Sequence, residues 1–426
     1  MPRTNDSNSA GRSSASVRDL LVRSFGAAVD AADPLKILPE HLPRPPGGRT
    51  FVVAVGKAAA SMAVAVERNW PSGAALDGIA LTRYGHGLPT ERIQVIEAGH
   101  PIPDSAGEAA ARRIFECASA LGPDDLLLAL ISGGGSALLS LPAPGITMNR
   151  LKAMTAELLR CGAAIQEINT VRKHASAIQG GRLAATTRAS VLALIISDVT
   201  GDDPTHIASG PCAPDPTTRV DAAAVLRKYG IAQPGEFSET PKPGDAVFAR
   251  VENRVIASAH RSLEAAAEIF RAHGVTPVIL GDSITGEASE VAKVMAALVR
   301  EIRLYGSPWN PPVALISGGE CTVTLRSSGG RGGRCSEFLL ALAVALETMD
   351  NVWAIAADTD GIDGSEDNAG ALLAPDSPAR AREHGLDARR FLAANDSYGF
   401  FSTLGDLLVT GPTRTNVNDY RAILIR

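Results

Sequence analysis

Short apolar runs recur along this chain, and most of them end in glycine, serine or aspartate. The runs are rich in valine, isoleucine, leucine and alanine, a composition typical of buried β-strands. Segments with helical spacing lie between several of the runs, which predicts an α/β fold built on a mainly parallel sheet. In the first half of the chain the predicted strands are 51–55, 78–81, 93–96, 126–131 and 191–196.

Two helical segments of this half have recognisable boundaries. Asp104 or Ser105 is a suitable N-cap for a helix whose first turn is acidic. The stretch 166–185 is basic and is interrupted by Gly180 and Gly181, which predicts either one long helix or a helix pair.

The segment 231–247 separates two series of predicted elements. It contains three prolines, two glycines and three acidic residues, the composition of a linker or surface loop. A chain of 426 residues is also too long for one ordinary core. We therefore predict a flexible tail over 1–16, a larger domain over 17–240 and a smaller one over 248–426. The strands predicted after the segment are 254–257, 276–280, 313–316, 322–325, 352–356, 407–410 and 421–425.

The phrase Leu-Ile-Ser-Gly-Gly occurs twice, each time at the end of an apolar run. Each copy predicts a strand that opens into a loop at its carboxyl end, where open α/β sheets bind ligands. Loops without side chains let backbone N–H groups approach an anion closely. We predict that phosphate or nucleotide is bound by Ser132, Gly133, Gly134, Gly135 and Ser136, and by Ser317, Gly318, Gly319 and Glu320. The alternative for the first loop, Ser132–Ser136, is a structural glycine turn.

Charge and cysteine content exclude several classes of function. The 41 basic and 46 acidic residues give a formal charge of −5, which provides no general attraction to nucleic acid or to an anionic membrane. The apolar runs are too short to span a bilayer. The five cysteines form no C-x-x-C pair, which favours free thiols in a reducing compartment over a disulfide framework or a zinc site. We therefore expect a cytoplasmic protein.

Several cations stand where an anion could bind. Lys57 follows the strand 51–55 and opens an alanine-rich helix, where a bound anion would use both the lysine and the helix start. The alternative is a solvated lysine; the segment is not a Walker A loop, because position 51 is not glycine. Arg331 and Arg334 in Gly-Gly-Arg-Gly-Gly-Arg, and Arg414 in Gly-Pro-Thr-Arg-Thr-Asn, could grip carboxylate or phosphate, or could be mobile surface.

Two acidic loops follow predicted strands. One contains Asp198, and the other, over 358–370, contains Asp358 and Asp360. Carboxylates packed this closely raise one another's pKa unless a cation neutralises them, and Mg²⁺ suits such a place. The alternative is a turn in which the aspartates bond to local backbone. The second loop only partly resembles a calcium-binding EF-hand loop, because Ile362 stands at the third acidic position.

Taken together, the chain resembles the type-2 glycerate kinases. The matching phrases fall in the same order over nearly the whole chain past the tail, at 54–59, 99–104, 131–139, 168–174, 197–204, 208–218, 316–320, 329–334, 358–370, 395–401 and 411–419. The resemblance implies a larger Rossmann-like amino-terminal domain, a smaller α/β carboxyl-terminal domain and a site in the cleft between them. It also implies transfer of the γ-phosphoryl group of ATP to the 2-hydroxyl of D-glycerate, with Mg²⁺. One departure is Cys335-Ser336, where relatives often have Asn-Gln.

Through this resemblance, Lys57 and Arg334 match the catalytic cations of the family. We expect them to neutralise the transferring group or to grip the glycerate carboxylate. Asp198, Asp358 and Asp360 are expected to hold Mg²⁺ or to take the hydroxyl proton. The predicted clamp on substrate or phosphate comprises Arg331, Thr413, Arg414, Asn416 and Lys173. The expected protein is a monomer or homodimer.

Two rival functions are weighed against the kinase. An NAD(P)H-dependent hydroxypyruvate reductase, a label that the same family has received, should carry G-x-G-x-x-G after a strand, and the chain has no such spacing. A non-catalytic protein that binds a phosphorylated metabolite would explain the glycine loops. It would not require the two cations and the two acidic loops.

Overall fold

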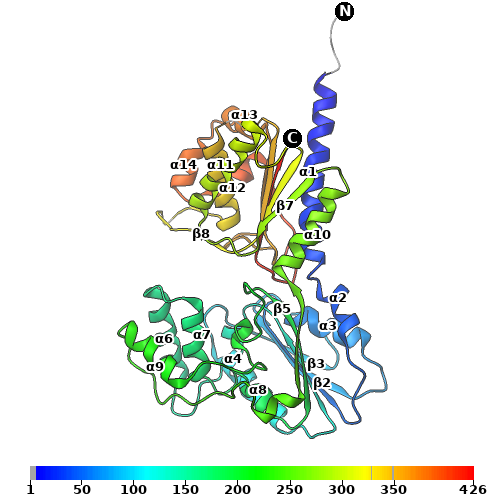
Figure 1. The fold of residues 1–426 in the computed structure, drawn as a ribbon, viewed down its shortest axis with the longest axis vertical. Helices are drawn as coiled ribbons and strands as arrows, with labels where there is room; N and C mark the ends of the chain where they lie inside the picture. Colours follow the sequence, from blue (N-terminus) through cyan, green and yellow to red (C-terminus); the bar gives the residue numbers. More distant parts are fainter. Residues whose placement is uncertain (1–5, 328, 348–349) are drawn as a thin grey trace, which may run out of the picture. The chain divides into compact units, whose positions relative to one another are not determined.

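The structure is a computed structural model that describes residues 6–327, 329–347 and 350–426, with side chains described from residue 16 onward (Figure 1). Its contacts divide the chain into two compact units. Unit 1 comprises Met1–Ala32, Ala259–Thr413 and Val417–Arg426. Unit 2 comprises Asp33–Ser258 and Arg414–Asn416. Both units are α/β, as the sequence predicts.

Unit 2 is built on a six-stranded, fully parallel sheet in the order β3-β2-β1-β4-β5-β6. The two central strands are buried along their whole length, which explains why they read as continuous apolar runs. The five strands predicted in the first half are confirmed. The bounds are β1 Thr50–Val55, β2 Leu76–Arg83, β3 Ile93–Ala98, β4 Leu126–Ile131, β5 Ser190–Ser197 and β6 Val251–Ser258.

The helices of unit 2 follow the predicted boundaries. Asp104 is the N-cap of α4 and accepts a hydrogen bond of 2.9 Å from the N–H of Gly107. The basic stretch is a helix pair, with Gly180 and Gly181 in left-handed backbone between the two helices. The bounds are α2 Pro34–Ile37, η1 Leu38–His41, α3 Ala59–Asn69, α4 Ser105–Ser119, α5 Gly135–Leu138, α6 Met148–Arg160, α7 Ile165–His174, α8 Arg182–Ala185, η2 Ile207–Ser209, α9 Arg219–Lys228 and η3 Ala246–Arg250.

Unit 1 contains a mixed six-stranded sheet in the order β13-β12-β11-β14-β9-β7, beside a two-stranded ribbon of β8 and β10. Within this six-stranded sheet, β7 and β9 pair in parallel and the other described pairs are antiparallel, while the ribbon of β8 and β10 is parallel. The mainly parallel sheet that the first half of the chain predicts therefore describes unit 2, and the unit 1 sheet is mixed. The physical reason is that β14 lies between β9 and β11 and runs against both. The bounds are β7 Thr276–Gly281, β8 Gly286–Glu287, β9 Val313–Ser317, β10 Cys321–Thr322, β11 Val352–Asp358, β12 Gly370–Leu373, β13 Leu407–Leu408 and β14 Asp419–Ile425.

Helices cover both faces of the unit 1 sheet. Alternate residues of β14 serve the two faces, with Leu424 packed among residues of α1 and α10, and Ile423 among residues of α11 and α12. Figure 1 shows α1 and α10 along one side of this sheet and α11 to α14 along the other. The bounds are α1 Asp6–Asp30, α10 Ala259–Arg271, α11 Ala288–Tyr305, α12 Arg334–Leu346, α13 Ser377–Glu383, α14 Ala388–Ala393 and α15 Ser397–Leu404.

The unit boundaries differ from the predicted domains in three places, one of which is the assignment of Arg414–Asn416 to unit 2. The loop 231–247 is part of unit 2, where its Phe237 is buried against α7 and α9, and the chain passes to unit 1 only after Ser258. The first helix belongs to unit 1, because Ser24 accepts a 2.8 Å hydrogen bond from the Tyr420 hydroxyl and Arg18 binds Asp406 at 2.6 Å. Of the predicted tail, residues 1–5 lie outside the described residues, and the chain is helical from Asp6. Proline and glycine content cannot distinguish a linker from a loop packed on its own domain.

Among the described helices, none is both long enough and apolar enough to cross a bilayer.

Candidate active site

The first Ser-Gly-Gly loop joins the ends of the two central strands of unit 2. The N–H of Ser132 donates to the carbonyl of Val55 at 2.9 Å, and the Ser132 hydroxyl accepts from the N–H of Ala58 at 3.1 Å. The N–H of Lys57 donates to the carbonyl of Gly133 at 2.9 Å. The loop that follows β4 and the turn that follows β1 are therefore held together as one structure.

Side chains from four other segments surround Gly133 and Gly134, the first two of the three glycines in this loop. A Cβ atom at Gly133 would overlap the carboxylate of Asp198 and would lie 2.8 Å from Nδ2 of Asn416. Gly134 has a φ of 82°, and a Cβ there would lie 3.0 Å from Nε2 of His100 and 3.5 Å from Cγ of Lys57. Only glycine fits this space without a shift of its neighbours.

The surrounded loop has the properties of an anion site. Within the described part of the chain, the N–H groups of Gly133 and Gly134 have no hydrogen-bond acceptor. The side chain of Lys57 lies beside Gly134, and Asp198 brings a carboxylate against Gly133, to which the side-chain amide of Asn416 donates at 3.4 Å. The structure therefore places together Lys57, the loop 132–136, Asp198 and Asn416, all of which the sequence analysis selected.

Buried polar groups support the loop from below. The hydroxyls of Ser136 and Ser209 are 2.8 Å apart, and the Ser209 hydroxyl donates to Oδ1 of Asn169 at 3.4 Å. The side-chain amide of Gln179 donates to the carbonyl of Ser136 at 2.9 Å. Ser209 holds a left-handed φ of 58°, a conformation that is costly outside glycine and that the surrounding contacts must maintain.

Sequence reasoning did not assign His100, Ser209, Asn169 or Gln179 to the site. His100 and Ser209 lie in the phrases 99–104 and 208–218, which were noted only as part of a family resemblance. Nothing in their local pattern indicates that they approach a loop distant in sequence.

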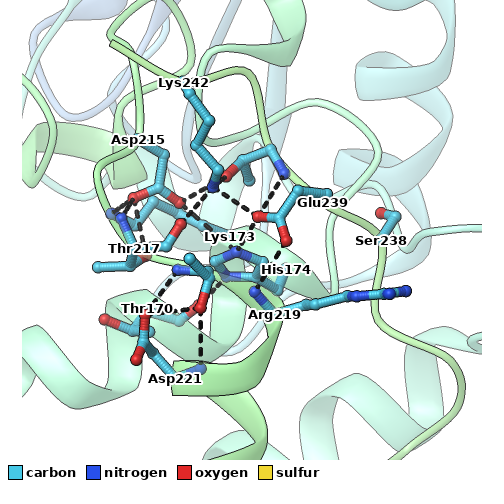
Figure 2. A network of polar contacts seen from close by, with 12 residues as sticks. Thr170, Lys173, His174, Asp215, Thr217, Arg219, Asp221, Ser238, Glu239 and Lys242 are labelled. Atoms are coloured by element: carbon cyan, nitrogen blue, oxygen red, sulfur yellow. Dashed lines mark hydrogen bonds and ion pairs between the residues drawn. The ribbon is translucent and has the colours of Figure 1, made fainter.

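Lys173 does not lie at the loop, so its predicted role as a clamp is wrong. Its side chain is 1% exposed, and its ammonium donates to Oδ1 of Asp215 at 2.7 Å (Figure 2). Asp215 also accepts from the N–H of Thr217 at 3.0 Å and from the hydroxyl of Thr240 at 3.0 Å. Burial acts to raise the pKa of Asp215, but the bonds from Lys173 and Thr217 outweigh it and lower that pKa. Lys173 is therefore half of a buried structural ion pair.

A wider network surrounds this pair and fixes the loop 231–247 to α7 (Figure 2). His174 lies 2.9 Å from the carbonyl of Thr170 through Nδ1 and 3.4 Å from Glu239 through Nε2. Lys242 is paired with the same Glu239 at 2.5 Å. Burial lowers the pKa of His174, so the ring is held in its neutral form to lower pH than usual.

In unit 1, three carboxylates hold the guanidinium of Arg334, the first residue of α12. Its Nε donates to Asp419 at 2.8 Å, and its two terminal nitrogens bind Asp358 at 2.7 Å and Glu320 at 2.9 Å. Burial opposes the charge, but Asp419, Asp358 and Glu320 outweigh it and raise the pKa of the guanidinium. The three acids come from one edge of the sheet, at the ends of β11 and β9 and the start of β14.

The acidic loop 358–370 forms a tight turn. Asp358 accepts the N–H of Asp360 at 3.0 Å, and Asp360 accepts the N–H of Ile362 at 3.0 Å. Asp363 accepts the N–H groups of Cys335 and Ser336 at 2.9 and 2.8 Å, which caps α12. Over the described ranges, no group of three or more His, Cys, Asp or Glu residues is arranged to hold a metal ion.

The second Ser-Gly-Gly loop is engaged in strand connections. The N–H of Gly318 donates to the carbonyl of Gly281 at 2.8 Å, and the carbonyl of Gly319 accepts the N–H of Asp419 at 3.2 Å. Gly319 has a φ of 98°, and a Cβ there would overlap the backbone of Ile284. Ser317 is buried at the end of β9, and Glu320 binds Arg334. Gly318 and Gly319 are thus held by neighbouring strands, and nucleotide binding by Ser317–Glu320 stays a prediction.

The remaining clamp candidates have separate surroundings. Arg331 is exposed and its guanidinium lies 4.8 Å from the ring centre of Tyr398. Thr413 donates its hydroxyl to the carbonyl of Thr359. Arg414 has a left-handed φ of 61°, and its carbonyl accepts the Ser61 hydroxyl at 2.7 Å in unit 2. Asn416 is the member of this set that approaches the glycine loop.

Comparison with known proteins gives consistent matches along the chain. A family profile described as a domain of unknown function (DUF4147) matches residues 20–239, and the MOFRL family profile matches residues 313–419. The chain is 52% identical over 419 residues to a protein of Agrobacterium vitis named "Putative hydroxypyruvate reductase", covering 96% of this chain and 95% of that protein. It is 39% identical to "Glycerate 2-kinase" of Pyrococcus horikoshii, covering 94% of this chain and 96% of the relative. The crystal structure of glycerate kinase from Thermotoga maritima matches with a TM-score of 0.87 at 37% identity, covering 96% of this chain and all of that one.

Proposed function

Because the chain belongs to the type-2 glycerate kinase family, we propose that it transfers the γ-phosphoryl group of ATP to the 2-hydroxyl of D-glycerate. The products would be 2-phosphoglycerate and ADP. The observation that carries this proposal is the glycine loop of unit 2, where bare backbone amides, the Lys57 side chain and the Asp198 carboxylate meet.

Phosphoryl transfer requires little covalent help from a protein. It requires positioning of the two substrates and charges set against the charge of the transferring group. The N–H groups of Gly133 and Gly134 would donate to phosphate oxygens, and the ammonium of Lys57 would neutralise the transferring group. His100 lies close enough to Gly134 to donate to the same phosphate or to accept the proton of the attacking hydroxyl.

The Asp198 carboxylate beside this loop fits a magnesium ion better than the carboxylates of the acidic loop in unit 1 do. Asp198 and Asn416 lie against Gly133, and Mg²⁺ typically takes one or two carboxylates together with phosphate oxygens and water. Asp358 is committed to Arg334 and to a backbone N–H, and Asp360 accepts a backbone N–H of its own turn. We therefore propose Asp198 as the main protein ligand. Bound Mg²⁺ would neutralise charge on the phosphate oxygens.

Arg334 keeps capacity for a ligand despite its three carboxylates. A guanidinium has five N–H donors, and three of its nitrogen-to-oxygen contacts in the described chain are to Asp419, Asp358 and Glu320. We propose that the remaining donors act on a phosphate or substrate oxygen. The three acids would fix the plane of the guanidinium, so that little rotamer freedom is lost when the ligand binds.

Two reaction mixtures test the proposal directly. Purified protein with ATP, Mg²⁺ and D-glycerate should release ADP, and phosphorus NMR should identify 2-phosphoglycerate. Protein with NADH and hydroxypyruvate should leave NADH unchanged; the reductase is tested because a relative with 52% identity carries that name. Oxidation of NADH without phosphorylation of glycerate would reverse the conclusion, and the 3-phosphate as product would refute the position assigned to the transfer.

A further inference from the structure

A small cavity in unit 1 is lined by Arg334, and the proposed mechanism assigns no ligand to it. Its volume is about 230 Å³. One wall is glycine backbone, from Gly330, Gly332 and Gly333, whose missing side chains leave room for Asn395, Ser397 and Asp363. The other lining residues include Arg334, Glu337, Asn395, Val323 and Leu325.

Glu337 is a buried carboxyl group that lines this cavity. The residue is only 4% exposed. Its Oε1 accepts a hydrogen bond of 3.1 Å from the side-chain amide of Asn395. In the described ranges no Lys, Arg or His comes within ion-pair distance of it. Burial raises the pKa of Glu337 to about 7. Burial of such a group lowers the stability of the fold. Polar groups that line a cavity commonly bind and orient a ligand.

The charges around the cavity disfavour an anionic ligand at its base. The single positive charge of Arg334 is already paired with three negative carboxylates. Glu287 and Asp363 add negative charge at Glu337, and Arg326 opposes them. A carboxylate or phosphate would be repelled there, whereas a neutral hydroxyl group can donate to Glu337. The side-chain amide of Asn395 is already bonded to Glu337, to the carbonyl of Thr324 and to the N–H of Arg326.

The rim of the cavity is apolar. Leu325 is 77% exposed, more than any other large hydrophobic residue of the described chain, and Val323 beside it is half-buried. An exposed leucine at the edge of a polar cavity suits a flat apolar ring placed against it. The cavity therefore offers a place for hydroxyl groups inside and for a ring at its mouth.

We infer that this cavity binds the nucleoside end of the nucleotide, with a ribose hydroxyl on Glu337 and the base against Leu325 and Val323. The inference rests on the proposed use of ATP. Its phosphates would then extend toward Arg334, the one cation that lines the cavity.

The ligand itself provides the first test. Calorimetric titration of the full-length protein with ADP and with 2′,3′-dideoxy-ADP, both with Mg²⁺, should show binding weakened about tenfold by loss of the two hydroxyls. In Glu337→Gln the same comparison should show less than about a threefold difference. Inorganic tripolyphosphate, which has no nucleoside, should bind wild type and variant alike. Equal binding of ADP and dideoxy-ADP to the wild type would overturn the inference.

A second variant on the surface keeps the test independent of folding. Leu325→Ser should weaken ADP binding about threefold and leave tripolyphosphate binding unchanged. Leu304→Ser is the matched control, because Leu304 is 70% exposed on α11 and does not line the cavity. If Glu337→Gln and Leu325→Ser raise KM for D-glycerate while KM for ATP stays constant, the cavity binds the acceptor and the inference is wrong.

The inference and the proposed function fail in different ways. Phosphorylation of D-glycerate by ATP, with no effect of the hydroxyls or of either variant, would retain the kinase and remove the nucleoside site. Hydroxyl-dependent ADP binding without phosphorylation of glycerate would retain the nucleoside site and refute the proposed kinase activity.

Discussion

The two Ser-Gly-Gly loops have the same sequence at the end of an apolar strand, yet the structure uses them differently. After β4, the loop 132–136 leaves its glycine N–H groups without acceptors in the described chain and places them beside Lys57. After β9, the N–H of Gly318 donates to Gly281 and the carbonyl of Gly319 accepts from Asp419, while the N–H groups of Gly319 and Glu320 have no acceptor in the described chain. We propose that the first loop binds a ligand and that the second mainly connects strands.

The difference comes from what lies next to each strand. In unit 2, β4 has parallel neighbours, so the loops after β1, β4 and β5 gather at one edge of the sheet. In unit 1, β9 pairs with antiparallel β14, which delivers Asp419 to the loop as soon as β9 ends. We propose that the first loop keeps glycine N–H groups available for a ligand because no antiparallel strand lies beside it.

The largest expected effect concerns the buried ion pair of unit 2. Lys173→Met should lower the free energy of unfolding by about 3–5 kcal/mol, because Asp215 would be left buried without its partner. Urea denaturation followed by circular dichroism measures this change. The double variant Lys173→Met with Asp215→Leu should recover much of the loss, since both charges are then absent. A stable single variant would show that the ion pair does not support this part of unit 2.

The second prediction tests whether the first loop serves chemistry. Lys57→Ala should reduce kcat/KM by roughly 10²–10³, about 3–4 kcal/mol of transition-state stabilisation, with little change in unfolding. Lys293→Ala is the control, because Lys293 is exposed on α11 and bound only to Glu290 in the same helix. Near-normal turnover of Lys57→Ala would show that Lys57, beside the first loop, does not take part in catalysis.

The third prediction concerns the acidic surroundings in unit 1. Burial raises the pKa of Glu337 to about 7, against about 4.5 in the unfolded chain. The folded state therefore holds its proton to higher pH, and the stability from this group is present below pH 4.5 and is lost as pH rises through 7. Between pH 4.5 and pH 8 the wild type should lose on the order of 3 kcal/mol more than Glu337→Gln. Chemical denaturation of both proteins at the two pH values measures the difference, and parallel curves would contradict it.

The smallest expected effect compares alanine substitutions in the two Ser-Gly-Gly loops. Gly319→Ala should cost about 1–3 kcal/mol of stability, because alanine is strained at this positive φ and its Cβ overlaps Ile284. Gly134→Ala has a similar φ but meets mobile side chains, so it should destabilise less and reduce activity more. Thermal unfolding and kcat, measured for both variants, give the comparison. Equal loss of activity and of stability in the two variants would mean that the loops do not differ in use.

Sequence reasoning succeeds where local pattern and burial coincide. The strands of unit 2 are predicted because continuous apolar runs require a sheet covered on both faces. Lys57, Asp198 and the loop 132–136 are predicted together because parallel strands bring their carboxyl ends to one edge. These inferences need only the order of elements along the chain.

The failures arise where a contact joins residues distant in sequence. The sequence of 317–320 contains no sign that Asp419 will pair with it, and that of Lys173 no sign that Asp215 will bury it. The antiparallel position of β14 likewise depends on the whole unit. Ser209 and Gln179 support the loop through single hydrogen bonds, which leave no periodic pattern to detect.

The central place of β14 has a consequence for biosynthesis. Unit 2 is nearly continuous along the chain, so a ribosome completes its sheet before most of unit 1 has been made. Unit 1 must wait: its helix α1 emerges first and its middle strand β14 last of all the described strands. Until that strand arrives, β9 and β11 have open edges in the nascent polypeptide, and aggregation or chaperone capture should be concentrated in this late interval.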